Sequence, residues 1–251
     1  MITTLRRVLF IAILMVIWEV ASRLSPVPDF MFPGVLQVLE TLFTGLFSGQ
    51  ITEAIFRSVG RLLIGFFIAT TLGLLLGYFI WRYKLVDDTL GFLVVALQSI
   101  PSIVWLPLAI VWFGLGEMAI LFVVTIGATW TMTITTASGF KNVPKLYRRV
   151  ARTFGSGGLH FVRTVIIPAS VPQIISGMRL AWAFSWRALM AGELLGAGGG
   201  LGHLLETGRS LGQMDLVISV MIIIALIGTI IDNVVFTRLD KRVQKKWGLA
   251  T

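Results

Sequence analysis

Six long apolar runs constrain this chain more than any other feature, and they lie near residues 7–24, 60–80, 88–111, 117–139, 173–195 and 215–236. Crossing a hydrocarbon core about 30 Å thick takes roughly 20 consecutive apolar residues as an α-helix. Lipid offers no water to backbone N–H and C=O groups, so each run must pair them internally, as a helix does. The pattern predicts an all-α integral membrane protein with about six transmembrane helices in a single domain, residues 1–251.

Composition narrows the classes further. The chain is 56% hydrophobic and only 13% charged, whereas soluble domains are about a quarter charged. Its net charge of +9 is carried by loops beside apolar runs, which is typical of membrane retention and not of nucleic-acid binding. The absence of cysteine excludes disulfides and thiolate metal sites. The first run is longer than a signal-peptide core and precedes no small-residue cleavage site, so we expect a retained helix.

The positions of Lys and Arg predict the orientation, because these residues are retained on the cytoplasmic side. With the N-terminus inside, sixteen of the 21 basic residues are cytoplasmic. The sixteen are Arg6, Arg7, Arg82, Lys84, Lys141, Lys145, Arg148, Arg149, Arg152, Arg163, Arg179, Arg238, Lys241, Arg242, Lys245 and Lys246. The other five are Arg23, Arg57, Arg61, Arg187 and Arg209. Both termini are therefore predicted to be cytoplasmic.

Residues 25–58 form the longest predicted external segment. Pro33-Gly34 opens a helix over 33–47, since proline suits a first helical turn. Its apolar stripe leaves two interpretations open: a helix lying along the outer membrane surface, or a packing helix that caps the bundle.

Residues 141–172 form a basic loop between two groups of spans. Within it we expect a short helix from Lys145 to Phe154, a turn at Gly155-Ser156-Gly157-Gly158, and a second helix that re-enters the membrane at Pro168. A compact helix-turn-helix displayed to the cytosol indicates a partner there.

The same loop resembles the EAA loop of permease subunits in ABC importers, which reads Glu-Ala-Ala, three residues, Gly, nine residues, Ile, one residue, Leu-Pro. Here Arg149-Val150-Ala151, Gly155, Val165 and Ile167-Pro168 stand at the same spacing. Arg149 replaces the family's acid, which removes any salt bridge that the acid makes.

A second set of motifs is similar to the nitrate, sulfonate, taurine and bicarbonate group of these permeases, over roughly residues 30–240. The matching positions are Pro33-Gly34, Ser58, Arg61, Gly65, Pro101, Pro107, Trp112-Phe113-Gly114, Glu193 and Gly200-Leu201-Gly202. Arg187 stands where an uncharged residue is expected.

The resemblance implies a type I ABC importer permease fold in the prokaryotic cytoplasmic (inner) membrane, in contact with lipid. It implies a homodimer with the pathway along its two-fold axis, two cytosolic ABC ATPase subunits, an external solute-binding protein and a small-molecule substrate, leaning toward an oxyanion or sulfonate. Ala151 would be small so that the coupling helix sinks into an ATPase cleft, and Gly155 would turn the chain. The implied ATPase-coupling residues are Lys145, Arg148, Arg149, Val150, Ala151, Arg152, Thr153, Phe154, Gly155 and Pro168.

The fifth run carries charged residues that cost several kcal/mol in lipid unless they face a cavity or a partner. We assign Trp182, Trp186, Arg187 and Glu193 to the translocation pathway. Arg187 either attracts an anion there or bonds to carbonyls or to an acid such as Glu19 or Asp232. Arg179, near the inner boundary, is expected to reach the lipid headgroups.

No catalytic constellation is present. His160 and His203 fall on opposite membrane sides, and no nucleophile elbow, metal motif or phosphate loop occurs. The glycine-rich segment 196–202 is interpreted as an external hinge. We therefore expect a non-catalytic transport subunit without a cofactor, whose ATP is hydrolysed by a partner. The alternatives are a secondary transporter or channel that needs no ATPase, and a membrane enzyme, for which no nucleophile–base pair lies in the spans.

Overall fold

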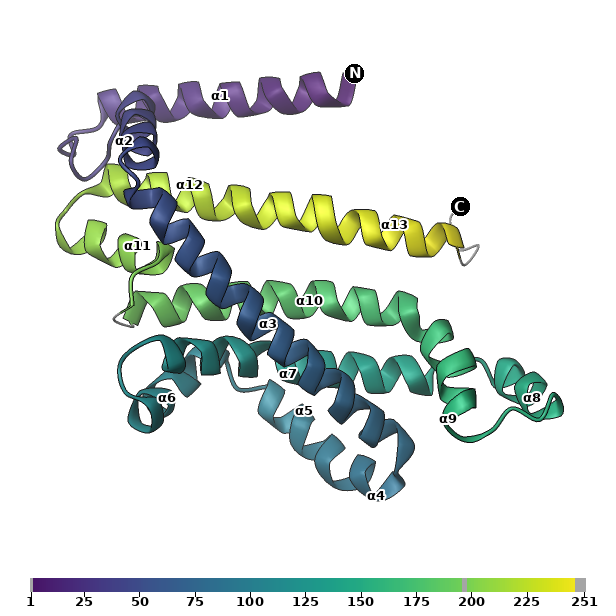
Figure 1. The fold of residues 1–251 in the computed structure, drawn as a ribbon. Helices are drawn as coiled ribbons and strands as arrows, with labels where there is room; N and C mark the ends of the chain where they lie inside the picture. The colour runs from purple at the N-terminus through teal and green to yellow at the C-terminus, as the bar shows by residue number, and fades with distance from the viewer. Residues whose placement is uncertain (1, 196–197, 247–251) are drawn as a thin grey trace. The chain divides into compact units, whose positions relative to one another are not determined.

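The computed structural model describes residues 2–195 and 198–246, and every regular element within these ranges is a helix (Figure 1). Gly196 and Ala197 of the predicted hinge lie outside the described residues. The elements are α1 (Ile2–Leu24), α2 (Val35–Phe47), α3 (Gln50–Arg82), α4 (Lys84–Val86), η1 (Asp87–Gly91), α5 (Phe92–Gln98), η2 (Ser102–Trp105), α6 (Leu106–Phe113), α7 (Glu117–Lys141), α8 (Lys145–Thr153), α9 (Gly158–Phe161), η3 (Val162–Ile166), α10 (Ile167–Leu195), α11 (Leu201–Ser210), α12 (Met214–Ile231), η4 (Asp232–Phe236) and α13 (Thr237–Lys246).

Four helices of the described chain are long and apolar enough to cross a membrane, or five if one bent pair counts as a single span. The four are Gln50–Arg82, Glu117–Lys141, Gly158–Leu195 and Met214–Val243. Helix α1 coincides with the predicted run at 7–24 but carries four charged residues. Its crossing of the membrane, and with it the six-span topology, stays a prediction.

The predicted span at 88–111 is broken in the structure. Helices Lys84–Gln98 and Ser102–Phe113 meet at 99°. Pro101 has no backbone N–H to continue the first helix, and it disfavours helical backbone at Ile100 before it. The Ser99 hydroxyl donates to the Ala96 carbonyl over 2.6 Å, which satisfies one of the carbonyls that the helix end leaves without a partner.

The chain forms two compact units. One consists of residues 1–58 and 193–227. In it Glu19 Oε2 accepts the Val35 backbone N–H at the start of α2 over 2.8 Å, and Ser219 Oγ donates to the Val38 carbonyl over 2.8 Å. Helix α2 buries Val35, Val38, Leu42 and Gly45, as a packing helix does. Leu36, Phe43 and Phe47 remain exposed, so the same helix also presents an apolar surface.

The other unit consists of residues 59–192 and 228–251, described to residue 246. Its core packs α3 against α7 and α10. A Cβ atom built at Gly65 would lie 2.6 Å from Val124 Cγ1, one at Gly73 2.5 Å from Met132 Cβ, and one at Gly77 2.6 Å from Thr136 Cβ. Small residues spaced by four thus let α3 and α7 approach closely, as membrane helices do in the absence of a hydrophobic drive between them.

This close approach gives a stability prediction. In Gly73→Ala the new methyl meets Met132 Cβ and, at 3.0 Å, the Thr133 backbone nitrogen, which cannot turn aside. We expect a loss of about 1–3 kcal/mol in the free energy of unfolding, the usual cost of overpacking. Gly60→Ala on the same helix meets nothing within 4 Å and should leave stability unchanged or raise it by up to about 1 kcal/mol. Thermal unfolding of both variants in detergent tests this, and equal melting temperatures would contradict it.

Candidate functional site

Helix α8 (Lys145–Thr153) is a short helix with a fixed end. Gly155 has φ +72°, a left-handed conformation that glycine adopts without steric cost. The Gly155 N–H donates to the Arg152 carbonyl and the Ser156 N–H donates to the Ala151 carbonyl, both over 2.9 Å. These two bonds form a Schellman motif, which satisfies carbonyls that the helix end would otherwise leave free. The expected turn at Gly155 is confirmed.

One face of α8 presents exposed apolar side chains. Leu146 is 65% exposed, Val150 47% and Phe154 83%. These residues lie four apart, so their side chains share one helix face. Lys145, Arg149, Arg152 and Thr153 are also exposed. We call Leu146, Val150 and Phe154 the α8 stripe. An apolar stripe of this kind on a short helix fits the groove of a partner protein.

Ala151 and Arg148 face their own chain instead. Ala151 is 9% exposed. Arg148 Nη2 donates to the Phe140 carbonyl over 2.7 Å and to the Lys141 carbonyl over 3.0 Å, at the end of α7. A small side chain at Ala151 lets α8 pack against its own protein. The entry of this helix into a partner's cleft stays a prediction.

Pro168 lies inside a helix. Helix Gly158–Leu195 is continuous, so a second helix follows the glycine turn as expected, and its entry into the membrane at Pro168 stays a prediction. A π-helical turn, η3, ends two residues before Pro168, at Ile166. Proline donates no backbone N–H and its ring crowds the preceding turn. A wider turn N-terminal to it accommodates both effects.

The four predicted pathway residues lie in different surroundings: Trp182 and Trp186 pack in an apolar cluster, Arg187 is exposed, and Glu193 is buried. Trp182 is 6% exposed and packs with its ring edge-on to Phe66, 5.2 Å between centroids, and 5.9 Å from Phe236. Trp186 packs against the same cluster, so the two tryptophans share a face as predicted. Both help to hold α10 against α3 and η4 within their unit.

Arg187 is exposed, and its Cζ lies 5.6 Å from the centre of the Phe184 ring. Across the described residues no hydrogen bond or ion pair is recorded for its side chain. Asp232, one of its candidate partners, binds Arg179 instead: Nε to Oδ1 is 2.6 Å and Nη2 to Oδ2 is 2.5 Å. Glu19, the other candidate, accepts from Arg23 and from the Val35 N–H. The expectation that Arg179 reaches the headgroups is corrected to a two-pronged ion pair with Asp232.

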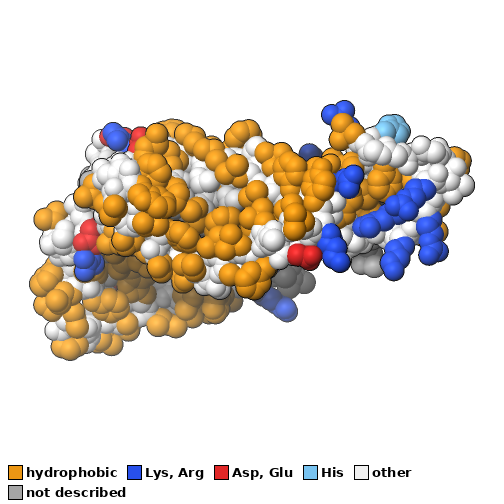
Figure 2. Space-filling view, turned by 90° about the horizontal axis from the view of Figure 1, so that it is seen from below, with side chains coloured by type: hydrophobic (Ala, Val, Ile, Leu, Met, Phe, Trp, Pro, Cys, Tyr) orange, Lys and Arg blue, Asp and Glu red, His pale blue; other side chains and the backbone are white. Residues whose placement is uncertain are grey.

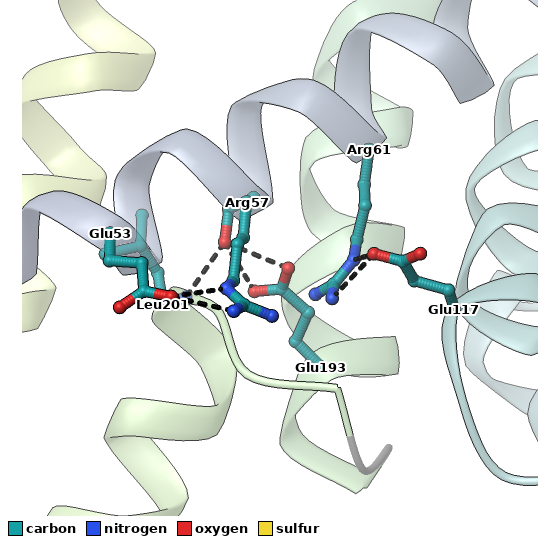
Figure 3. Close-up of polar contacts among 7 residues, drawn as sticks. Glu53, Arg57, Arg61, Glu117, Glu193 and Leu201 are labelled. Atoms are coloured by element: carbon teal, nitrogen blue, oxygen red, sulfur yellow. Dashed lines mark hydrogen bonds and ion pairs between the residues drawn. The ribbon is translucent and has the colours of Figure 1, made fainter.

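Glu193 is fully buried in a polar cluster (Figure 3). The Ser58 hydroxyl lies 2.9 and 2.7 Å from its two carboxylate oxygens, and the Gly202 N–H donates to Oε2 over 3.0 Å. The Leu201 N–H donates to Ser58 Oγ over 2.8 Å. The carboxylate and hydroxyl thus receive backbone donors at the start of α11, where a helix leaves its first N–H groups unsatisfied.

The contacts in and beside this cluster explain why particular residue types stand at the motif positions Gly200 and Arg61. Gly200 has φ +111°, and a Cβ there would overlap the Glu193 carboxylate. One turn beyond Ser58 on α3, Arg61 is 4% exposed and its Nη2 lies 3.1 Å from Oε1 of Glu117 (Figure 3). On α11 itself, hydrogen bonding from the Arg209 guanidinium lowers the pKa of Glu206 below its usual value.

We expect Glu193→Gln to destabilise the protein. The amide keeps the volume of the side chain but places an NH₂ group where one carboxylate oxygen accepts, opposite the Ser58 hydroxyl or the Gly202 N–H. Losing a charge-assisted hydrogen bond costs about 1.5–3 kcal/mol. Glu53→Gln removes only the exposed pair with Arg57, a helix i,i+4 pair of about 0.3–0.5 kcal/mol. If the melting temperature falls equally in both variants, the buried cluster contributes no more to stability than the exposed ion pair.

The sequence analysis does not find three of these residues. Leu146 is not among the implied ATPase-coupling residues, although the apolar spacing of 146, 150 and 154 indicates the exposed stripe. Ser58 is a motif position there and not the partner of Glu193, which is 135 residues away along the chain. Asp232 is one of several candidate partners for Arg187 and is not considered for Arg179, because sequence does not tell which of two arginines on one helix faces an acid.

Comparisons with known proteins agree with the family resemblance described under the sequence analysis. The family model described as binding-protein-dependent transport system inner membrane component matches residues 69–245. A putative ABC transporter permease protein of Methanocaldococcus jannaschii is 36% identical over 226 residues, which cover 88% of this chain and 85% of the relative. A putative aliphatic sulfonates transport permease of Bacillus subtilis is 29% identical, covering 94% and 85%. A nitrate import permease of Synechocystis is 29% identical, covering 91% and 86%.

Among solved structures, an inward-facing methionine ABC transporter shares the fold, with a TM-score of 0.69 over 76% of this chain and 95% of that chain. Its sequence identity is 19%. The predicted fold class, an all-helical permease of the type I importer kind, is confirmed.

Proposed function

We propose that two copies of this chain form the pathway of an ATP-driven importer. The chain belongs to the family of inner membrane components of binding-protein-dependent transport systems, the permeases of ABC importers. Two cytosolic ABC ATPase subunits hydrolyse the ATP, and an external solute-binding protein delivers the substrate. The complex lies in the prokaryotic cytoplasmic membrane with both termini of the permease in the cytosol. The positions of sixteen of the 21 basic residues support this orientation.

The observation that carries the coupling role is the exposed α8 stripe beside basic side chains on a helix with a fixed end. In this mechanism α8 seats in a cleft of the ATPase, closure of the ATPases moves the permeases from inward-open to outward-open, and hydrolysis resets them. The stripe residues Leu146, Val150 and Phe154 make the contact, together with the exposed Lys145, Arg149 and Thr153. Ala151, Arg148 and Gly155 act by holding α8 on its own chain, so that movement of the helix is transmitted to α7 and α10.

The proposed substrate is a small oxyanion or sulfonate. Its support is Arg187, a cation on a helix long enough to span the membrane, exposed and without an ion pair in the described residues. Such a group in lipid costs about 2.5–3.5 kcal/mol, so it belongs where water or a partner reaches it. In a homodimer two Arg187 side chains would flank one pathway. Relatives named for sulfonate and nitrate transport agree with an anionic substrate. Trp182, Trp186 and Glu193 contribute by fixing α10.

Co-purification with uptake tests the proposal. The tagged permease, expressed with the ATPase and binding protein of its own organism, is isolated in mild detergent and reconstituted into liposomes. We expect equal amounts of permease and ATPase to co-elute, and solute uptake that requires both ATP and the binding protein. A permease that elutes alone and moves solute down its gradient would instead be a secondary carrier or channel.

A further inference from the structure

A cavity of about 550 Å³ opens between the end of α3, the inner face of α8 and the turn that follows α8. Trp81 and Arg82 line it from α3, Arg148 and Arg152 from α8, and Ser156 from the turn. Figure 2 shows Lys and Arg side chains gathered at the α8–α9 end, next to a hydrophobic surface. Helix α3 is one of the helices apolar enough to span a membrane and it ends at Arg82, so the cavity lies at a membrane boundary.

The charge of this cavity is of one sign. Three arginines line it, and none of the lining residues is acidic. Within the described part of the chain no ion pair is recorded for Arg82, Arg148 or Arg152. The Arg82 guanidinium lies 5.3 Å from the centre of the Tyr83 ring, and only Nη2 of Arg148 is occupied, by carbonyls of α7. Guanidinium groups that converge without a carboxylate are typical of sites for phosphate oxygens, to which arginine donates two parallel bonds.

Two donors at this cavity have no acceptor. Arg148 Nε and Ser156 Oγ are buried atoms without a hydrogen-bond partner among the described residues. Buried polar atoms are nearly always paired, so each orphan calls for an explanation. Both side chains line the cavity, and a small turn of either toward an anion held there would give it an acceptor. These orphan donors are independent of the charge count and indicate the same ligand chemistry.

Tyr78, Trp81, Tyr83 and Phe161 also line the cavity, beside Leu159 and Val162. Tyr78 and Trp81 lie 5.9 Å apart between ring centres, and Trp81 stands 5.5 Å from Phe140. Tryptophan and tyrosine are enriched at the level of lipid headgroups. A free phosphate needs no aromatic wall and fills a small part of 550 Å³. A headgroup with its glycerol backbone uses both the cations and the rings.

We infer that this cavity binds the phosphate group of an anionic membrane lipid. Residues two positions apart on a helix point about 200° away from each other, so Arg148 and Arg152 lie on the face of α8 opposite Leu146, Val150 and Phe154. The lipid therefore sits behind α8, between it and α3, while the α8 stripe stays free for a protein partner. The inference does not depend on ATPase docking, and it makes the seating of α8 on its own chain sensitive to lipid composition.

The test is binding of defined lipids to the delipidated full-length permease in detergent, without ATPase, followed by native mass spectrometry and thermal unfolding. We expect dioleoylphosphatidylglycerol to bind and to raise the melting temperature, and dioleoylphosphatidylcholine to bind about tenfold or more weakly because its choline cation meets three arginines. Arg82→Gln should weaken phosphatidylglycerol binding about ten- to a hundredfold, the value of one charge-assisted hydrogen bond. Ser156→Ala, which alters no charge, should weaken it several-fold.

Arg163→Gln is the matched control, because Arg163 follows the lining residue Val162 on η3 but is exposed and does not line the cavity. Equal weakening in Arg163→Gln and Arg82→Gln would overturn the inference in favour of diffuse surface charge, as would equal binding of the two lipids. Full displacement of phosphatidylglycerol by millimolar inorganic phosphate would overturn the lipid as the occupant. Since these measurements use the permease alone, a failed ATPase interaction cannot produce any of these results.

Discussion

Phe154→Asp is expected to abolish ATP-driven uptake while the permease stays folded. The ring is 83% exposed in this chain, so the substitution removes little internal contact. In a complex where α8 seats in an ATPase cleft, the ring is buried, which contributes about 1.5–3 kcal/mol, and an unpaired carboxylate there costs several more. A loss of at least about 4 kcal/mol weakens the ATPase interaction by roughly three orders of magnitude. Co-purification and uptake in proteoliposomes measure both consequences.

His160→Asp is the control for this variant, because His160 is exposed on the same loop but lies outside α8. It should retain the ATPase and the uptake. Ala151→Trp is a less discriminating test: its side chain faces its own protein, so it would displace α8 whatever the partner. Uptake in Phe154→Asp at the level of the unmodified permease, with the ATPase still bound, would remove α8 from the coupling role.

The helices were predictable from sequence because lipid allows few alternatives for an apolar run. Runs near 60–80, 117–139, 173–195 and 215–236 coincide with helices that meet the length and apolarity needed for a span. The break at Pro101 was not predicted, because a hydropathy profile averages the apolar character of many residues and contains no information on backbone geometry. Only the 99° bend between the two helices reveals that this run does not continue straight.

Helix α8 was predictable because its signals are local. Its residues and the glycine turn follow from a spacing within one short segment, and Gly155 has the left-handed conformation that its position requires. Orientation was not predictable in the same way. Whether Ala151 faces a partner or its own protein depends on how α8 rotates against residues from other elements. The pairing of Arg179 with Asp232 over 53 residues depends likewise on tertiary packing.

Arg187 is the residue on which the proposed anion specificity depends. It lies eight residues before the end of α10 at Leu195, or about 12 Å at 1.5 Å per residue, too far in for a residue at the membrane edge. Its partners in the described chain are limited to the ring of Phe184. Both acids considered for it bind other groups. A cation placed this way requires an anion or water that the isolated chain does not provide.

Arg187→Gln is therefore expected to lower uptake of an anionic substrate by about ten- to a hundredfold, the value of one charge-assisted hydrogen bond of about 1.5–3 kcal/mol. Arg187→Lys should retain part of the uptake, because it keeps the charge and loses the planar fork of donors. Initial rates in proteoliposomes that contain ATPase and binding protein measure the loss, while the unchanged melting temperature of an exposed position excludes misfolding. Arg209→Gln, which removes a cation bound to Glu206 on α11, is the control for charge and should transport normally. If Arg187→Gln and Arg209→Gln transport equally well, Arg187 lies outside the pathway, and its cation serves the lipid or subunit surface instead.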